Sequence, residues 1–144
     1  MLLNDENMKS TAKAVWNGSL KEGKGNLSAL TSFFSQLPYT FNSRFGDGKG
    51  GTNPEELIAA AHAGCYSMAL SAELGKAGIV PDSIETASTI TMDNGNITQS
   101  HLVVKARVTG ISQENFEKIA NETKSACPVS RVLNLEITLD ASLL

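Results

Sequence analysis

The sequence predicts an α+β fold of order roughly βββ-α-ββ-α-β, in which antiparallel strands accompany one long, buried central helix. Short stretches that alternate apolar and polar residues predict the strands, and most are separated by only a few turn-forming residues. Strands joined in this way form hairpins, which are antiparallel. A mostly apolar run at 57–72 predicts the long helix. With 144 residues the chain has about the size of one domain, so we expect a single domain over 1–144.

The first third of the chain is predicted to contain three short strands. Strands at 11–16 and 25–30 are joined by a glycine-containing turn, and a third is expected at 33–37. A proline break follows, and 39–45 is expected to be a loop. The glycine-rich stretch at 46–51 lacks the spacing and the Lys-Ser/Thr ending of a phosphate-binding loop, so we favour a flexible connector over phosphate binding.

The long helix has strong signals at both ends. Asn53 can cap it, Pro54 suits the first helical position, and Glu56 completes a pattern like a capping box. Gly78 is a stop signal after a helix that we expect to run to about Lys76. The helix is rich in alanine and glycine, which let other backbone segments come close, so we expect it to be central to the core.

The second half of the chain is predicted to begin with a hairpin. Its strands, at 83–92 and 97–109, are connected through Asn94-Gly95, a strong turn signal. Ser112 is expected to cap a second helix that runs to about 126. After it, Pro128 is placed to start a short new helical turn, and a last strand is expected near the C-terminus, at 135–139.

Charge and hydropathy exclude several classes of function. The net charge is −3, and the few basic residues are scattered, so we expect neither a nucleic-acid partner nor binding to an anionic membrane. The apolar run at 57–72 is shorter than the roughly 20 residues of a membrane-spanning helix. The stretch 1–11 shows no secretory pattern. We therefore expect the cytosol, where a cysteine pair is more often catalytic, redox-sensing or metal-binding than a permanent structural bridge.

The two cysteines, Cys65 and Cys127, stand in different local settings. A cysteine in the middle of a helix, like Cys65, is more often a small buried hydrophobe than a reactive group. Cys127 directly precedes Pro128, where a helix would begin, and a helix N-terminus stabilises a thiolate. Local physics alone therefore favours Cys127 as the more acidic thiol. Their separation in the sequence neither requires nor forbids a contact.

Other polar residues have both a functional and an ordinary explanation. Arg44, in a polar and aromatic loop, could lower the pKa of a thiol or be a solvated loop residue. Glu55 and its neighbour Glu56 both suit a first helical turn, and nothing local separates them. His62 lies three residues before Cys65, but it is more often a packed helix residue in such a place. The scattered histidines and cysteines do not favour a metal site, and we expect none.

Three stretches of the chain carry a more specific signal. The stretch 51–58 (GTNPEELI), followed by AAHA at 60–63 and then by Cys65, closely resembles the signature of the OsmC family. The stretch 38–45 (PYTFNSRF) is similar to the segment that precedes this signature. The stretch 127–130 (CPVS) is similar to the family's second cysteine motif.

The resemblance covers about 11–139 and implies an OsmC-like fold that forms an intertwined homodimer with its sites at the interface. The position of Arg44, just before the glycine-rich loop, is similar to that in the OsmC branch and not to that in the organic hydroperoxide resistance branch. The resemblance implies that Cys65 is the reactive cysteine and Cys127 the resolving one. It also assigns the family's arginine to Arg44 and its glutamate to Glu55.

The activity implied by the resemblance is that of a thiol-dependent peroxidase, which reduces organic hydroperoxides to alcohols and protects against oxidative stress. Cys65 would become a sulfenic acid, and Cys127 would condense with it to a disulfide. A small or protein-bound dithiol would then reset the pair. The resemblance implies no metal and no bound cofactor.

Helix geometry adds a prediction about assembly. Glu55 and Cys65 are ten residues apart on one predicted helix, or roughly 15 Å at 1.5 Å per residue. This is too far for both to serve one site directly within a chain. If two antiparallel copies of the helix crossed at a two-fold axis, Glu55 of one subunit could reach Cys65 of the other. We therefore predict that each site is built from two chains.

Two alternatives remain at the level of the sequence. One is a non-catalytic, dimeric binding domain with two inert cysteines. The other is a Cys-His hydrolase that uses Cys65 and His62, which lie side by side on a helix at a spacing of three residues. Only the peroxidase prediction requires a Cys65–Cys127 disulfide after exposure to a hydroperoxide.

Overall fold

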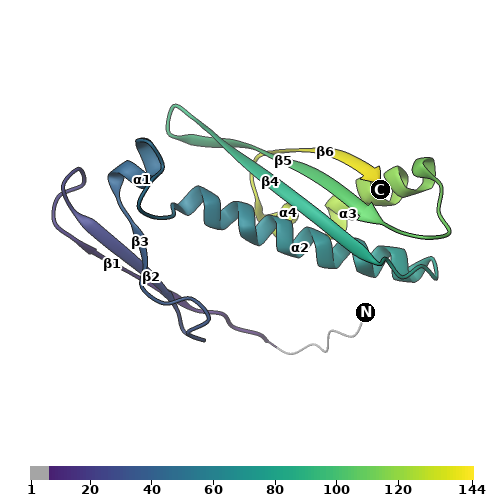
Figure 1. The fold of residues 1–144 in the computed structure, drawn as a ribbon, viewed down its shortest axis with the longest axis horizontal. Coiled ribbons are helices and arrows are strands. Elements are labelled where there is room, and N and C mark those ends of the chain that lie inside the picture. Colours follow the sequence, from purple (N-terminus) through teal and green to yellow (C-terminus); the bar gives the residue numbers. More distant parts are fainter. Residues whose placement is uncertain (1–6) are drawn as a thin grey trace. The chain divides into compact units, whose positions relative to one another are not determined.

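Two three-stranded sheets and four helices make up the part of the chain that the computed structural model describes, residues 7–144 (Figure 1). The α+β class and the long helix are confirmed. The chain divides into two compact units, the first ending at Leu57 and the second running Ile58–Leu144; the single domain over 1–144 stays a prediction. The stretch 1–11, in which the sequence shows no export signal, lies partly outside the described residues.

The first unit is built on an antiparallel sheet of order β1-β2-β3. Its strands are β1 (Ala12–Asn17), β2 (Lys24–Ala29) and β3 (Leu37–Tyr39), and adjacent strands are antiparallel. The first two lie where the sequence predicts them, but the third begins at Leu37 instead of ending there. Ser32 and Gln36 both have positive φ angles, so the preceding stretch turns and cannot form an extended strand.

A short helix, α1 (Phe41–Phe45), replaces the loop expected over 39–45. It forms because Thr40 and Ser43 make a reciprocal capping box: each side chain bonds the backbone N–H of the other, at 3.0 and 2.8 Å. The buried Ser43 hydroxyl also donates to the backbone carbonyl of Thr52 at 2.7 Å. This ties α1 to the residues that lead into the long helix and fixes the place of Arg44.

The long helix, α2 (Pro54–Lys76), has the predicted bounds. The Asn53 side chain accepts a hydrogen bond from the backbone N–H of Glu56 at 2.8 Å, as expected of a cap. The predicted return bond of a capping box is replaced, because the Glu56 carboxylate accepts from the hydroxyl group of Thr52 at 2.7 Å. Beyond the helix, Gly78 has a φ of +77°, which suits a glycine stop.

The second unit contains a sheet of order β4-β5-β6. The strands β4 (Ser83–Asp93) and β5 (Asn96–Arg107) form the predicted antiparallel hairpin. The last strand, β6 (Glu136–Leu143), is parallel to β5, so the expectation that all strands are antiparallel is wrong for this pair. The helices α3 (Gln113–Ala126) and α4 (Pro128–Val132) lie between β5 and β6 in the chain and provide the crossover that a parallel pair requires.

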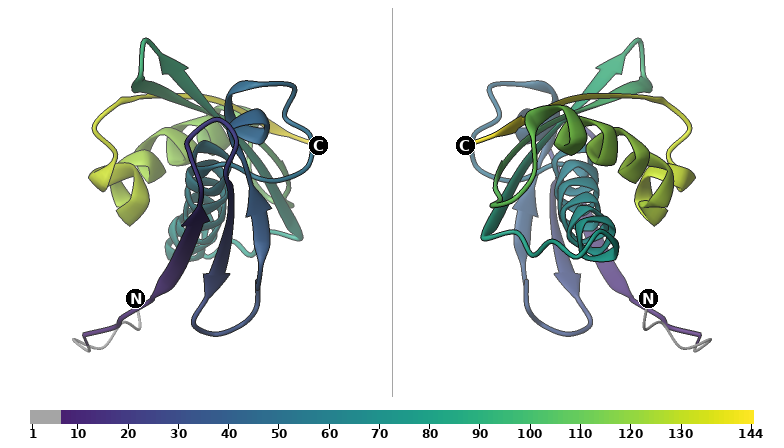
Figure 2. Two further views of the ribbon diagram at one scale, coloured as in Figure 1. Left: turned by 90° about the vertical axis from the view of Figure 1, so that its left-hand side faces the viewer. Right: turned by 90° about the vertical axis from the view of Figure 1, so that its right-hand side faces the viewer.

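The core of the second unit lies where α2 and α3 cover the same face of this sheet, as the views in Figures 1 and 2 show. It contains aromatic and aliphatic side chains from α2, β5 and α3, together with one cysteine: Tyr66, Leu70, Leu74, Leu102, Val104, Ala106, Phe116, Ala120 and Cys127. The central role predicted for the long helix is therefore confirmed. In the part of the chain that is described, no helix has the length and apolar character needed to traverse a bilayer.

Candidate active site

The two cysteines come from different elements of the second unit and lie close together. Cys65 is on α2 and is half-buried, whereas Cys127 is fully buried at the junction of α3 and α4. Both thiols are free, and Cys127 lies close enough to Cys65 to raise the pKa of its thiol. The fold thus brings together the pair whose contact the sequence left open.

The surroundings of Cys65 act on its pKa in both directions, with a net increase. Burial is the largest effect and raises the pKa of the Cys65 thiol, and the neighbouring Cys127 raises it further. A hydrogen bond from the backbone N–H of Val129 and the positive charge of Arg131 lower the pKa of Cys65. Cys65 therefore has two groups on α4 that favour its thiolate, although burial outweighs them within one chain.

The first turn of α4 acts on Cys65, whereas the sequence analysis expected it to stabilise a thiolate at Cys127. Cys127 occupies the N-cap position, but its side chain makes no capping hydrogen bond. The backbone N–H of Val129, in the first turn, acts on Cys65 instead. Pro128 signals that a helix starts here, but the direction of its N–H groups depends on packing between α4 and α2. Val129 and Arg131 are site residues that the sequence reasoning missed for this reason.

The first unit holds the other two predicted residues, Arg44 and Glu55, as an ion pair. Arg44 Nε donates to the two carboxylate oxygens of Glu55 at 3.1 and 3.2 Å, and Arg44 Nη2 donates to Oε1 at 2.6 Å. These bonds raise the pKa of Arg44 and lower the pKa of Glu55. Glu56 has a different partner, the hydroxyl group of Thr52. The structure thus separates the two glutamates that the sequence could not.

Arg44 borders a largely aromatic cavity of about 230 Å³ in the first unit. Its guanidinium carbon lies 4.9 Å from the ring centroid of Phe45, a cation–π distance. The Trp16 and Tyr39 rings are 5.3 Å apart between centroids. The remaining side of the cavity includes Leu20. The surroundings of Arg44 can therefore accommodate an apolar group next to a positive charge.

The geometry of His62 does not support the alternative of a catalytic Cys65–His62 pair. This residue is fully buried, and its two ring nitrogens hydrogen-bond with the hydroxyl groups of Ser100 and Ser130 at 2.6 and 2.8 Å. Burial lowers the pKa of His62. Since both nitrogens already have partners, neither is available to take a proton from Cys65. The expectation that His62 is a packed helix residue is confirmed.

Within residues 7–144 there is no cluster of three or more histidine, cysteine, aspartate or glutamate side chains that could hold a metal ion. The other histidine, His101 on β5, has partners other than the cysteines. Its ring bonds Thr138 at 2.6 Å and pairs with Asp140 at 3.2 Å, on the neighbouring strand β6.

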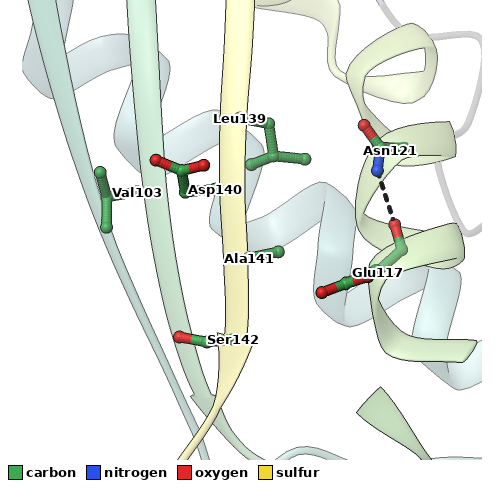
Figure 3. A pocket seen from close by; sticks show the side chains of 7 residues that line it. All are labelled: Val103, Glu117, Asn121, Leu139, Asp140, Ala141 and Ser142. Carbon is green, nitrogen blue, oxygen red and sulfur yellow. Dashed lines mark hydrogen bonds between the residues drawn. The ribbon is translucent and has the colours of Figure 1, made fainter. Parts of the chain in front are cut away.

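A separate cavity, of about 300 Å³, lies between α3 and β6 in the second unit (Figure 3). Glu117 and Asn121 line it from α3, and Asp140 and Ser142 line it from β6. The Asn121 amide donates to the backbone carbonyl of Glu117 at 2.9 Å, within its own helix. None of the four predicted site residues lines this cavity, so we assign it no part in thiol chemistry.

A family model, curated relatives and a solved structure all agree with the resemblance seen in the sequence. The family described as OsmC-like protein matches residues 46–142. Peroxiredoxin OsmC of Escherichia coli is 47% identical over 135 residues, which cover 91% of this chain and 94% of that protein. Organic hydroperoxide resistance protein-like 2 of Staphylococcus epidermidis is 30% identical over 123 residues, covering 82% and 87%. The structure of the organic hydroperoxide resistance protein OhrB of Bacillus subtilis superposes with a TM-score of 0.65 at 23% identity, covering 92% and 98%.

Proposed function

The chain belongs to the OsmC family, and on this premise we propose that it is a thiol-dependent peroxidase that reduces organic hydroperoxides to alcohols. The observation that carries the proposal is the proximity of Cys65 and Cys127, the two cysteines of the chain. The names of its relatives, a peroxiredoxin and an organic hydroperoxide resistance protein-like protein, support both the activity and the type of substrate.

The chemistry needs only these two thiols, a hydroperoxide and an external dithiol. The Cys65 thiolate attacks one oxygen of the peroxide, the O–O bond breaks, and the alkoxide leaves and is protonated to an alcohol. Cys65 is then a sulfenic acid. The Cys127 thiolate attacks this sulfur, the hydroxide leaves as water, and a disulfide forms. A dithiol reduces the disulfide by exchange and is itself oxidised.

In this proposal Arg44 favours the Cys65 thiolate and stabilises negative charge on the departing oxygen. Glu55 holds the guanidinium in place through the bidentate ion pair. The aromatic cavity beside Arg44 suits the organic part of a hydroperoxide. The proposed reductant is a small or protein-bound dithiol, which points to a reducing compartment such as the cytosol.

We further propose that the active form is an intertwined homodimer in which Arg44 and Glu55 of one subunit serve Cys65 of the other. Glu55 and Cys65 are separated by ten residues on α2, roughly 15 Å along an ideal helix. Two copies of α2 crossing at a two-fold axis would remove this separation. The protection against oxidative stress that we expect follows from this activity.

The test is to treat the reduced protein with cumene hydroperoxide while counting free thiols and locating any disulfide by mass spectrometry. The natural chain should lose both thiols and form a Cys65–Cys127 disulfide. Cys65→Ser should abolish turnover. Cys127→Ser should still react once at Cys65 but should not form the internal disulfide or recycle with a dithiol.

Three outcomes would contradict the proposal or its assignment of roles. Thiols that persist in the presence of the hydroperoxide would favour the non-catalytic binding domain. Ester or amide hydrolysis that persists in Cys127→Ser, without consumption of peroxide, would favour the Cys-His hydrolase. Formation of the sulfenic acid on Cys127 instead of Cys65 would reverse the roles of the two cysteines.

A further inference from the structure

A chain of four hydrogen-bonded side chains crosses the interior of the second unit close to the cysteines. The ring of His62 on α2 bonds Ser100 on β5 at 2.6 Å and Ser130 on α4 at 2.8 Å. The Ser100 hydroxyl also bonds that of Ser88 on β4 at 2.9 Å. His62 and Ser100 are fully buried and Ser130 is 6% exposed. These polar groups therefore form hydrogen bonds with one another instead of with water.

These hydrogen bonds differ in which elements they connect. Ser88 and Ser100 lie on adjacent strands of a hairpin that is already fixed by its backbone ladder. Ser130 lies on α4, a helix of five residues whose N-cap side chain makes no hydrogen bond. Its bond to His62 is therefore a tie between α4 and the long helix α2. A helix this short has little stability of its own and depends on such tertiary contacts.

Every group of α4 that acts on Cys65 depends on where α4 lies. Cys127 precedes this helix, and the backbone N–H of Val129 and the charge of Arg131 both lower the pKa of Cys65. Ser130 lies between the last two in the sequence. His62 stands three residues before Cys65, so its side chain projects from the same side of α2 as the thiol. The tie between α2 and α4 is thus made within one helical turn of the reacting sulfur.

We propose that the His62–Ser130 hydrogen bond positions α4 so that Cys127 and the Val129 N–H meet Cys65. His62 and Ser130 are positioning residues in this scheme: neither touches the substrate or exchanges a proton with it. A neutral imidazole suits the role, because one ring nitrogen donates and the other accepts, and a hydroxyl group can do either. The predicted effect on the reaction with peroxide rests on the proposed function, whereas the predicted effect on the position of α4 does not.

The comparison of Ser130→Ala with Ser100→Ala separates positioning from ordinary core stability. Each variant removes one buried hydroxyl group that bonds the same imidazole ring, and Ser100→Ala also removes the bond to Ser88. Ser100→Ala should therefore lose at least as much stability as Ser130→Ala. Only Ser130→Ala removes the tie to α4. Ser130→Thr keeps the hydroxyl group and should react at a rate near that of the natural chain.

The measurement uses the reduced full chain with diamide, an oxidant that couples two thiols without a peroxide. Ser130→Ala should form the Cys65–Cys127 disulfide about five- to tenfold more slowly than the natural chain, and Ser100→Ala should remain within about twofold of it. The rate at which iodoacetamide alkylates Cys65 rises with pH as the thiol ionises. The midpoint of this rise should move to higher pH in Ser130→Ala, because the Val129 N–H is displaced. Thermal unfolding of both variants gives the stability comparison.

Equal slowing in the two variants, or slowing in neither, would overturn the positioning role. The peroxidase proposal fails separately, because its failure is a natural chain that forms the disulfide with diamide but does not consume cumene hydroperoxide. If both proposals hold, Ser130→Ala should also accumulate sulfinic acid on Cys65 under excess hydroperoxide, since a slow second step leaves the sulfenic acid exposed to further oxidation.

Discussion

The pKa of Cys65 is subject to two opposing effects that have different structural origins. The thiol sits in the middle of a long helix, and burial there raises its pKa. The groups that favour the thiolate, Arg131 and the Val129 N–H, belong to a segment more than 60 residues away in the sequence. Local reasoning about Cys127 identified the helix start at Pro128, and the Val129 N–H in the first turn of this helix lowers the pKa of Cys65. The reactivity that we propose for Cys65 therefore depends on its neighbours, and the proposed dimer would add Arg44 as a further cation.

The ion pair of Arg44 and Glu55 allows a prediction about pH. The pKa of Glu55 is lowered in the folded chain, so its ionised form contributes stability above its unfolded pKa of about 4.3, and this contribution is lost as pH falls through the lower, folded value. Glu55→Gln should lower the free energy of unfolding at pH 6–7 by up to about 1 kcal/mol, since the pair is partly exposed. The difference should vanish in acid.

The matched control for this variant is Glu56→Gln, one residue further along the same helical turn. Its amide oxygen can still accept from Thr52, so both stability and peroxide consumption should stay near those of the natural chain. Denaturant unfolding between pH 3 and 7 measures the first quantity, and a peroxide assay the second. An equal loss of peroxide consumption in the two variants would argue against a specific role of Glu55.

At the scale of the elements, the three-stranded sheet of the first unit depends on Gly25 in β2. A Cβ atom built there would lie 2.5 Å from the ring of Tyr39 and 2.6 Å from the ring of Trp16, which are paired with Gly25 on the two neighbouring strands. Both rings also border the cavity beside Arg44. The absence of a side chain at this position lets the two aromatic residues approach each other across the middle strand.

Gly25→Ala should therefore destabilise the first unit by roughly 1–3 kcal/mol through overpacking. The single tryptophan of the chain, Trp16, reports on this unit directly, so denaturant unfolding followed by its fluorescence is the measurement. Gly75→Ala in α2 is the control, because a Cβ atom there meets no atom within 4 Å and alanine favours a helix by about 1 kcal/mol. Equal unfolding midpoints for Gly25→Ala and the natural chain would contradict this account.

At the scale of the whole molecule, the two units differ in how much apolar surface they bury. All the fully buried apolar side chains among residues 7–144 belong to the second unit. In the first unit, Leu30 and Phe33 are 78% and 95% exposed. A sheet of three strands needs an apolar face packed against something to be stable. On α2, Met68 is 77% exposed on the side opposite the core. These exposed apolar groups support the proposed homodimer.

The proposed dimer leads to a prediction about Met68. If the exposed side of α2 packs against its copy, Met68→Asp should convert the dimer to monomers, because two carboxylates would be buried near a two-fold axis. Analytical ultracentrifugation measures the mass, and peroxide consumption should fall together with the dimer. Val80→Asp is the control, since Val80 is 84% exposed in the segment between α2 and β4. A monomeric natural chain that is fully active would refute the two-chain site.

The sequence by itself determined features that depend on neighbouring residues. The bounds of α2, the hairpin of β4 and β5, the capping residues Asn53 and Ser112 and the start of a helix at Pro128 all follow from local turn and capping chemistry. The motifs around the cysteines were sufficient to identify the family. Short elements were less predictable: α1 depends on reciprocal bonds between Thr40 and Ser43, and a mixture of polar and aromatic residues does not reveal them.

Only the tertiary structure decided which distant groups meet. The contact between Cys65 and Cys127, the parallel pairing of β6 with β5 and the bonds of His62 to two serines join residues separated by 30 or more positions. Such contacts are set by how helices pack on the sheet. Periodicity shows which side of an element is buried but not what it is buried against. The two cysteines are therefore visible in the sequence, whereas the surroundings that make them unequal are a property of the fold.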